Sequence, residues 1–256
     1  MRLKLTLAYL GCAYAGWQVQ AVALDKDTVQ GELERVLESL VGYPVRVHGA
    51  GRTDSGVHAE GQVAHVDVPD KNVDWRRALN SKLSHDIRIL AAESVSDDFH
   101  ARYSAVGKQY AYTLFYGHES VPPRLEPFVW ATPYLDFSAM DAIAEILTGR
   151  HDFASLQNTG TLVADTVREI WSIRREQGVA GIFRCPGGWP VTTLLFHGNG
   201  FLKQMVRNLV GLIVWGGLGR ITPSEAVAYL AAKDRRAVPS PTAPARGLTL
   251  MGVEYP

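Results

Sequence analysis

The sequence predicts an α+β protein in which helices are layered on one face of a sheet. Residues 3–9 alternate between apolar and polar side chains, which is the pattern of a half-buried strand. Residues 29–40 repeat apolar side chains at helical spacing, and Asp27 or Thr28 can cap the helix that they predict. A second helix is expected from Asp74 onward, before a further strand. Two strand–helix–strand passages of this kind are typical of an α+β fold.

The composition is that of an ordinary globular protein, with 46% hydrophobic and 20% charged residues. Its 256 residues give room for one large or two modest domains. The 26 basic and 26 acidic residues cancel, whereas proteins that contact phosphates usually carry a basic excess. Residues 99–118 and 198–220 nevertheless contain basic side chains and no acid, so each could contribute to a local basic surface.

The sequence indicates a protein of the cytoplasm. Cys12 and Cys185 lie far apart and fit no metal-ligand spacing, so free thiols in a reducing compartment are expected. The first residues alternate as a strand and lack the continuous apolar stretch of a signal peptide. No run of about 18 apolar residues could span a membrane. We therefore expect no metal site and no membrane association.

A glycine-rich loop between two expected strands is the strongest candidate for a functional site. Residues 45–47 and 64–68 alternate as strands on its two sides, and Asp54 lies at its centre, between Arg52 and His58. A polar loop held by two strands is a usual way to fix a reactive group. An aspartate in such a turn can equally be an Asx-turn residue that satisfies local backbone N–H groups. The loop is not a dinucleotide fingerprint, because an aspartate takes the place of the third glycine, and no Walker lysine follows.

A second glycine-punctuated loop, residues 11–18, follows the first strand and carries two aromatic side chains. The simpler interpretation of this segment is a loop pinned by buried rings. We expect Trp17 in particular to be buried.

An aromatic strand over residues 108–116 opens the second half of the chain. Tyr110, Tyr112 and Leu114 fall on one face of this strand, so a packed aromatic ladder is one interpretation. For Tyr112 this is the interpretation that we favour, because aromatic side chains are common at half-buried strand positions.

A helix over residues 135–149, capped near Asp136 or Ser138, is expected next. His151 and Asp152 follow it, but adjacent side chains seldom face each other, so we interpret the two residues as part of a loop rather than as a catalytic pair. Further strands are expected over residues 165–175, 179–184 and 191–197.

Residues 200–213 predict a helix with an apolar stripe and an opposite polar stripe. The polar stripe consists of Gly200, Lys203, Gln204, Arg207, Asn208 and Gly211. The usual fate of charges such as Lys203 and Arg207 is a solvated helix face. The stripe contains no acid, however, and its glycines permit the close approach of another surface.

The loop around Asp54 resembles the signature loop of the tRNA pseudouridine synthase A family, in the segments Gly51-Arg52-Thr53-Asp54-Ser55-Gly56-Val57-His58-Ala59 and Gly61-Gln62-Val63. Four further matches occur in the family's order, at Ala15-Gly16-Trp17-Gln18, at Lys108-Gln109-Tyr110-Ala111-Tyr112, at Gln204-Met205-Val206-Arg207-Asn208 and at Ala245-Arg246-Gly247-Leu248. The chain departs from the family at Leu10, where an aspartate is usual, so any contact of that aspartate is not carried over.

The resemblance implies a fold of two ferredoxin-like or RRM-like halves that share a central mixed, mainly antiparallel sheet, divided here as residues 1–104 and 105–256. It implies conversion of uridine to pseudouridine in the anticodon stem-loop of tRNA, at adjacent positions (38–40), without cofactor or metal. It also implies a homodimer in which the second subunit completes the cleft.

The resemblance further assigns roles to residues. Asp54 is the catalytic aspartate, Tyr110 lies in the active site, and Arg207 pairs with Asp54, whose charged form a guanidinium favours. The target uridine must be flipped out of the RNA, and Arg52 is placed to fill the vacated space or to hold the adjacent phosphate. Weaker candidates for contacts with the RNA are Gln18, His58, Lys108 and Lys203.

Two other hypotheses are compatible with these residues. One is a catalytically silent protein that binds or folds tRNA, which would keep its function after Asp54→Asn. The other is a hydrolase or nuclease in which Asp54 and His58 act with a metal, and a chelator would abolish that activity.

Overall fold

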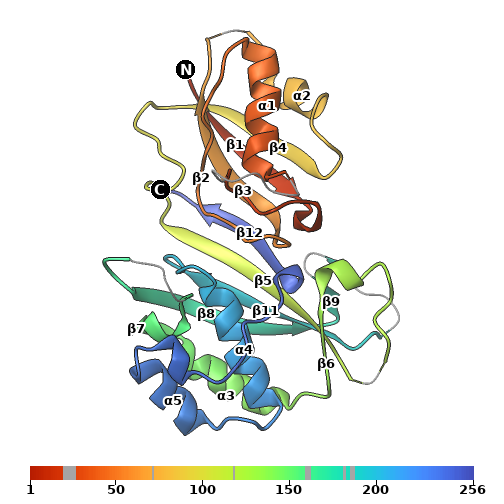
Figure 1. Ribbon diagram of the computed structural model, residues 1–256, viewed down its shortest axis with the longest axis vertical. Coiled ribbons are helices and arrows are strands. Elements are labelled where there is room, and N and C mark those ends of the chain that lie inside the picture. The colour runs from red at the N-terminus through yellow and green to blue at the C-terminus, as the bar shows by residue number, and fades with distance from the viewer. Residues whose placement is uncertain (20–26, 71, 118, 159–162, 181–182, 185–187) are drawn as a thin grey trace. The chain divides into compact units, whose positions relative to one another are not determined.

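The computed structural model describes the whole chain except residues 20–26, 71, 118, 159–162, 181–182 and 185–187 (Figure 1). Contacts between Cα atoms divide the chain into two compact units. Unit 1 comprises Met1–Val106 together with Thr249–Pro256, and unit 2 comprises Gly107–Leu248. Nearly all of the last strand therefore belongs with the first half of the chain. Whether residues 1–104 and 105–256 behave as separate domains stays a prediction.

Unit 1 is a sheet with two helices packed on it. Its strands are β1 (Arg2–Tyr9), β2 (His48–Gly49), β3 (His58–Asp67), β4 (Ile87–Val95) and β12 (Leu248–Glu254), and its helices are α1 (Val29–Val41), α2 (Trp75–Asn80) and the short 3-10 turn η1 (Gly11–Ala13). β1 lies between β3 and β4 and is antiparallel to both, whereas β12 runs parallel to β3. Figure 1 shows α1 and α2 beside each other against these strands.

Local patterns account for the elements that the sequence predicted in unit 1. The side chains of β1 alternate between buried and half-buried positions, which follows from the two-residue period of a strand. Thr28 caps α1 by accepting a hydrogen bond from the Gly31 N–H, and Gly42 ends the helix in the left-handed conformation, at φ +91°. The expected helix at Asp74 is also confirmed, because its carboxylate caps α2.

The strand expected over residues 45–47 is wrong, because only His48 and Gly49 pair with β3. The backbone of Val47 bonds to side chains of α1 instead of to a neighbouring strand. Its N–H donates to the Glu34 carboxylate at 2.9 Å, and its carbonyl accepts from the Gln30 amide at 2.9 Å. Side chains of α1 thus make the hydrogen bonds that a neighbouring strand would otherwise make with Val47. An alternating sequence does not show that a helix supplies these partners.

Unit 2 contains the remaining strands and three helices. Its strands are β5 (Gly107–Tyr116), β6 (Trp130–Thr132), β7 (Gly149–Asp152), β8 (Val167–Gln177), β9 (Val179–Ala180), β10 (Phe183–Arg184) and β11 (Val191–Gly198). Its helices are α3 (Phe137–Leu147), α4 (Met205–Gly217) and α5 (Pro223–Ala231), with 3-10 turns η2 (Glu126–Phe128), η3 (Ala154–Leu156), η4 (Arg235–Ala237) and η5 (Ala245–Gly247).

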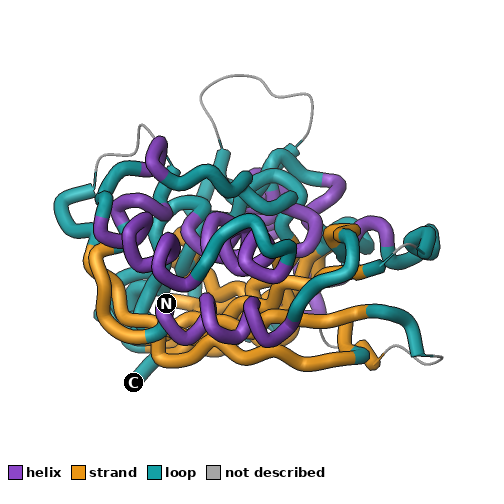
Figure 2. The backbone as a smooth tube through the Cα atoms, turned by 90° about the horizontal axis from the view of Figure 1, so that it is seen from below, coloured by secondary structure: helices purple, strands orange, loops and turns teal. Residues whose placement is uncertain are grey.

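The main strands of unit 2 follow the order β5-β11-β8-β7, each antiparallel to the next, and β6 pairs in parallel with β5. With mainly antiparallel strands and helices in both units, the α+β prediction is confirmed (helices and strands are distinguished in Figure 2). Asp136 caps α3 as expected. No helix among the described residues is long and apolar enough to cross a membrane.

His151 and Asp152 lie in β7, not in a loop as expected. They do not form a catalytic pair, because their side chains bond to different partners. The His151 Nε2 lies 2.9 Å from the Thr148 carbonyl oxygen, whereas the Asp152 carboxylate accepts from the Thr166 hydroxyl and pairs with Lys233 at 3.0 Å. The two side chains therefore fasten neighbouring segments together.

Candidate active site

The backbone of the Asp54 loop is fastened to the loop that follows β1. The Trp17 N–H donates to the Thr53 carbonyl at 3.0 Å, and the Gly56 N–H donates to the Gly11 carbonyl at 3.2 Å. Gly16 and Asp54 form an isolated antiparallel bridge between the two loops. Asp54 is thus held by main-chain bonds on both sides, which gives a loop residue the rigidity of a strand.

Two glycines of residues 11–18 make this close approach possible. A Cβ atom on Gly11 would lie 1.9 Å from the Val57 carbonyl oxygen, a distance that no side chain can take. Gly16 has φ +104°, and a Cβ there would lie 2.7 Å from the Thr53 carbonyl oxygen. Both positions therefore require glycine if the two loops are to pack.

Buried polar side chains support the Asp54 loop from β1 and β3. The Tyr9 hydroxyl lies 2.8 Å from the Thr53 Oγ1, and the Gln62 amide donates to the Gly51 carbonyl at 2.8 Å. Burial raises the pKa of Tyr9 to about 12, despite its hydrogen bonds to Thr53 and Gln62. The phenol therefore stays protonated at neutral pH and can serve as a fixed hydrogen-bonding partner.

Asp54 itself is half-buried, and Arg52 beside it is exposed. The turn that follows Asp54 is closed by the main chain, because the Val57 N–H donates to the Asp54 carbonyl at 3.1 Å and Gly56 takes φ +83°. The N–H groups of Gly56 and Val57 both reach backbone carbonyls, so neither needs the Asp54 carboxylate as an acceptor. This weakens the interpretation of Asp54 as a residue that serves only its own turn.

His58, one of the expected RNA contacts, is buried against the loop of residues 11–18, and its contact with RNA stays a prediction. Its side chain is 3% exposed, and its Nδ1 accepts a hydrogen bond from the Gly11 N–H at 3.2 Å. An imidazole that accepts there carries its proton on Nε2 when neutral, so the ring positions the Gly11 backbone. The same burial argues against His58 as the partner of Asp54 in a metal-dependent hydrolase.

The loop of residues 11–18 is pinned by a buried ring, as expected. Trp17 is 2% exposed, its ring centroid lies 6.1 Å from that of Tyr9, and a Cβ on Gly49 would lie 2.5 Å from the indole. Gln18, expected near the RNA, follows this buried ring and is half-buried. Leu10 is 40% exposed, and its backbone N–H donates to the Asp86 carbonyl at 2.9 Å. Leu10 therefore fastens this part of the chain through its backbone.

Tyr110 and Lys108 lie on β5 in unit 2, two residues apart and therefore on one face of the strand. Tyr110 is 9% exposed, and its ring meets that of Phe201 edge to face, with 5.2 Å between centroids. Lys108 is half-buried. Tyr112 is fully buried, and its hydroxyl donates to the Pro244 carbonyl at 2.8 Å, which confirms it as a packed residue.

The helix expected from residue 200 begins five residues later, at Met205. Gln204 precedes it with φ +59°, a left-handed conformation that costs energy in a residue with a side chain. Lys203 is exposed, and its carbonyl accepts from the Asn158 N–H at 3.0 Å. The chain therefore turns sharply at Gln204, just before the helix that carries Arg207. The helical spacing of the sequence predicted a continuous helix there.

The polar stripe of α4 packs against the chain's own residues 240–243. Asn208 is 1% exposed, donates to the Leu156 carbonyl at 2.8 Å and accepts from the Thr242 hydroxyl at 2.6 Å. A Cβ on Gly211 would lie 1.9 Å from the Pro241 carbonyl oxygen. The expectation that small residues here admit a second surface is confirmed, and that surface belongs to this chain.

Arg207 is half-buried and oriented by the same segment. Its Nε donates to the Ala243 carbonyl at 2.7 Å, and its own carbonyl accepts from the Ala243 N–H at 3.1 Å. Arg207 is therefore not the freely solvated helix residue of the simplest interpretation. The structure thus groups Asp54, Arg52, Gln18 and His58 in unit 1, and Tyr110, Lys108, Lys203 and Arg207 in unit 2.

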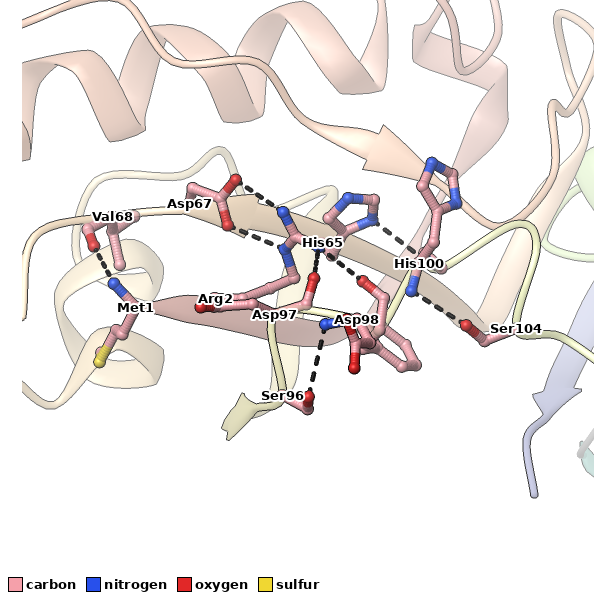
Figure 3. A network of polar contacts seen from close by, with 12 residues as sticks. Met1, Arg2, His65, Asp67, Val68, Ser96, Asp97, Asp98, His100 and Ser104 are labelled. Atoms are coloured by element: carbon pink, nitrogen blue, oxygen red, sulfur yellow. Dashed lines mark hydrogen bonds and ion pairs between the residues drawn. The ribbon is translucent and has the colours of Figure 1, made fainter.

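Sequence reasoning missed a cluster of three histidines in unit 1, because His48, His65 and His100 are far apart in the chain (Figure 3 shows the last two). His48 and His65 stack with 5.0 Å between ring centroids and 18° between ring planes, and His100 meets His65 at 4.6 Å. The rings border a pocket of about 380 Å³, which we call the histidine pocket. Its remaining wall is formed by Tyr43, Pro44, Val45, Arg46, Arg2 and Asp67.

Two rings of this cluster, those of His65 and His100, have a lowered pKa and so favour the neutral form. Burial, and then the neighbouring His100, His48 and Arg2, lower the pKa of His65 to about 4. The pKa of His100 is lowered as well, first by burial. The Nδ1 of His65 accepts from the Ala101 N–H at 3.1 Å, and a proton on this nitrogen would break that bond.

Among the residues that the structure describes, no group of three or more histidine, cysteine, aspartate or glutamate side chains is arranged to hold a metal ion. The histidine cluster illustrates the reason. Its backbone-bonded Nδ1 atoms place the proton of the neutral ring on Nε2, and a protonated nitrogen cannot bind a metal.

Known proteins match this chain over the segments that contain the candidate site residues. A family model for tRNA pseudouridine synthase matches residues 6–104 and 143–256, which include Asp54 and Arg207. The tRNA pseudouridine synthase A of Nitratidesulfovibrio vulgaris (strain Miyazaki F) is 51% identical over 277 aligned residues that cover 99% of each chain. That of Coxiella burnetii (strain Dugway) is 42% identical and covers 100% of this chain and 93% of its own. The chain therefore belongs to the tRNA pseudouridine synthase family and is an enzyme of the isomerase class.

Among solved structures, a Cbf5–Nop10–Gar1 complex matches 85% of this chain and 45% of its own with 11% identity and a TM-score of 0.37. That likeness is too weak to carry an argument.

The contact between the two loops predicts that Gly11→Ala lowers the free energy of unfolding by about 1–3 kcal/mol, because the new methyl group must displace the Val57 carbonyl. Urea denaturation measures the change. Gly252→Ala is the matched control, since a Cβ there meets nothing within 4 Å and should change stability by less than about 0.5 kcal/mol. Equal stability of the two variants would contradict the argument.

The lowered pKa of His65 predicts an acid-sensitive fold. Because the folded protein binds this proton more weakly than the unfolded chain, stability is full above about pH 6.5 and falls as the pH drops toward about 4. Between pH 7 and pH 5 the loss from this residue should be about 2 kcal/mol. His65→Asn keeps an acceptor for the Ala101 N–H and should reduce that slope in urea denaturation. An unchanged slope would show that the proton is bound elsewhere.

Proposed function

We propose that this enzyme isomerises uridine to pseudouridine in the anticodon stem-loop of tRNA, with Asp54 as the catalytic carboxylate. The observation that carries the proposal is the position of Asp54, half-buried in a loop whose backbone is bonded to a second loop on both sides. Membership of the tRNA pseudouridine synthase family supports the reaction and the class of substrate. The anticodon stem-loop is an inference from the resemblance of the sequence motifs.

The reaction breaks the bond between N1 of uracil and C1′ of ribose and forms a bond between C5 and C1′. N1 gains a proton and C5 loses one, so that the product is an isomer of the substrate. An ionised Asp54 serves as nucleophile or base in this sequence. A carboxylate whose main chain is already fixed acts without first paying the entropy of ordering a loop.

Arg207 is proposed as the cation that keeps Asp54 ionised. A guanidinium favours the charged form of a neighbouring carboxylate, and it keeps its own charge at any pH the enzyme meets. The bond from its Nε to Ala243 fixes the plane of the group. Tyr110, whose ring is already packed against Phe201, is proposed to stack on the target base and to place its hydroxyl near the reacting groups.

Contacts with the RNA are proposed for Arg52, Lys108, Lys203 and Gln18. Arg52 and Lys203 are exposed and can reach phosphates, whereas Lys108 and Gln18 are half-buried and can contact RNA only close to the protein surface. Extruding the uridine costs a few kcal/mol of stacking, which a side chain such as Arg52 can offset by filling the gap. The enzyme is proposed to act in the cytoplasm, as a homodimer whose second subunit completes the cleft.

The first test is release of tritium from unmodified tRNA labelled at C5 of uracil, measured both with and without EDTA. Asp54→Asn should abolish release while tRNA still binds, because an amide can act neither as a nucleophile nor as a base. Asp70→Asn, which alters an exposed carboxylate elsewhere in unit 1, should leave release unchanged.

The outcomes separate the alternatives. Release by Asp54→Asn at the rate of the wild type would remove Asp54 from the chemistry. Binding of tRNA without release by the wild type would favour a catalytically silent tRNA-binding protein. Inhibition by EDTA would point to a metal-dependent reaction.

Arg207→Lys should lower kcat by about 100-fold while KM for tRNA changes little, because lysine keeps the charge but cannot reproduce the fixed, planar group. Arg220→Lys, at an exposed position over the Trp215 ring, is the control and should keep full activity. Thermal melting of both variants shows whether the loss of the bond to Ala243 has unfolded the site. A folded Arg207→Lys enzyme with normal kcat would refute the assignment.

A further inference from the structure

The histidine pocket has no role in the chemistry proposed for Asp54, and its position shows why. His65 lies seven residues further along β3 than His58, which adjoins the Asp54 loop. At about 3.3 Å per residue, the two ends of this strand are roughly 20 Å apart. A uridine that reacts at Asp54 cannot also occupy the pocket, but a folded tRNA extends much further than this distance.

One wall of the pocket is rigid and electrically balanced. Arg2 forms two parallel bonds with the Asp67 carboxylate, each of 2.9 Å, and its NH1 donates to the Phe99 carbonyl at 3.1 Å and to the Asp97 carbonyl (Figure 3). The charges of this pair offset each other, and its hydrogen-bonding capacity is committed to the protein. Arg2 therefore shapes the pocket and is not available to bind a ligand.

His48 is exposed and His100 is half-buried, so these two rings can offer aromatic faces to a ligand, whereas His65 is 3% exposed and serves as their packing partner. His100 uses Nδ1 to accept from the Arg102 and Tyr103 N–H groups at 3.1 and 3.3 Å, as His65 does toward Ala101. Both neutral rings therefore carry an N–H at Nε2. Such a set suits a planar ligand with hydrogen-bond acceptors, and it is unsuited to a metal ion.

The rim of the pocket adds an exposed ring and a cation. Tyr43 is 47% exposed. The Arg46 side chain is 54% exposed and reaches Glu34 only at 3.5 Å, so it keeps its capacity to bind an anion. Aromatic faces beside an arginine are what proteins use to hold an unpaired nucleotide, with the base stacked and the phosphate at the cation.

We propose that the histidine pocket is a second contact point for the substrate RNA, which takes an unpaired nucleotide of the tRNA other than the uridine that reacts. The base stacks against the rings of Tyr43, His48 and His100, and Arg46 binds its phosphate. A volume of about 380 Å³ accommodates a nucleobase. This inference rests on the proposed function, because it takes tRNA as the substrate.

The test measures the affinity of an unmodified full-length tRNA transcript by fluorescence anisotropy, and the single-turnover rate of tritium release with enzyme in saturating excess. Tyr43→Ser and Arg46→Gln should each raise Kd by about tenfold and leave the saturated single-turnover rate unchanged. Tyr43→Phe keeps the ring and should bind as the wild type does. All three substitutions are at exposed positions, and thermal melting checks that each variant is folded.

Matched controls are Tyr134→Ser and Arg35→Gln, which remove an exposed tyrosine and an exposed arginine elsewhere and should leave Kd within about twofold. Unchanged Kd values for both Tyr43→Ser and Arg46→Gln would overturn the proposal, as would a Tyr43→Phe variant as weak as Tyr43→Ser. Failure of the proposed function is distinguishable, because the wild type would then release no tritium, whatever the values of Kd.

Discussion

The contact between two glycine-bearing loops is the constraint on which the Asp54 site depends. Gly11 packs against the Val57 carbonyl, and Gly16 bridges to Asp54, because neither position carries a Cβ. The bonds from Trp17 to Thr53 and from Gly56 to Gly11 then close the assembly from both sides. A carboxylate on a long polar loop would otherwise sample many positions, and these main-chain bonds restrict the backbone that carries it.

Elements whose signals are local could be predicted from the sequence. The alternation of β1, the Thr28 cap of α1 and the Asp136 cap of α3 each involve residues within one turn or one strand, so the order of side chains along the chain contains the information. Residues 45–47 show the limit of this reasoning. They alternate like a strand, but Glu34 and Gln30 reach across from a helix and take the backbone groups of Val47.

The candidate site likewise has features that the sequence could predict and features that it could not. The segment around Asp54 is contiguous, so its resemblance to a family signature is visible in the sequence alone. The burial of His58 could not be predicted, because it depends on Gly11, 47 residues away. The partner of the α4 polar stripe is likewise a distant segment, Pro241–Ala243, and the left-handed turn at Gln204 interrupts a helix that spacing alone would continue.

Asp54 and Arg207 are both held in position by main-chain hydrogen bonds, although they lie in different units. In both residues the main chain bonds to a partner segment, and Arg207 adds a bond from Nε to the same segment. A charged side chain that is ordered only by an opposite charge loses its geometry when that charge moves away. A charged side chain whose backbone is held by carbonyl and N–H groups of its own unit keeps its direction without such a partner, so the entropy of ordering it is lost on folding.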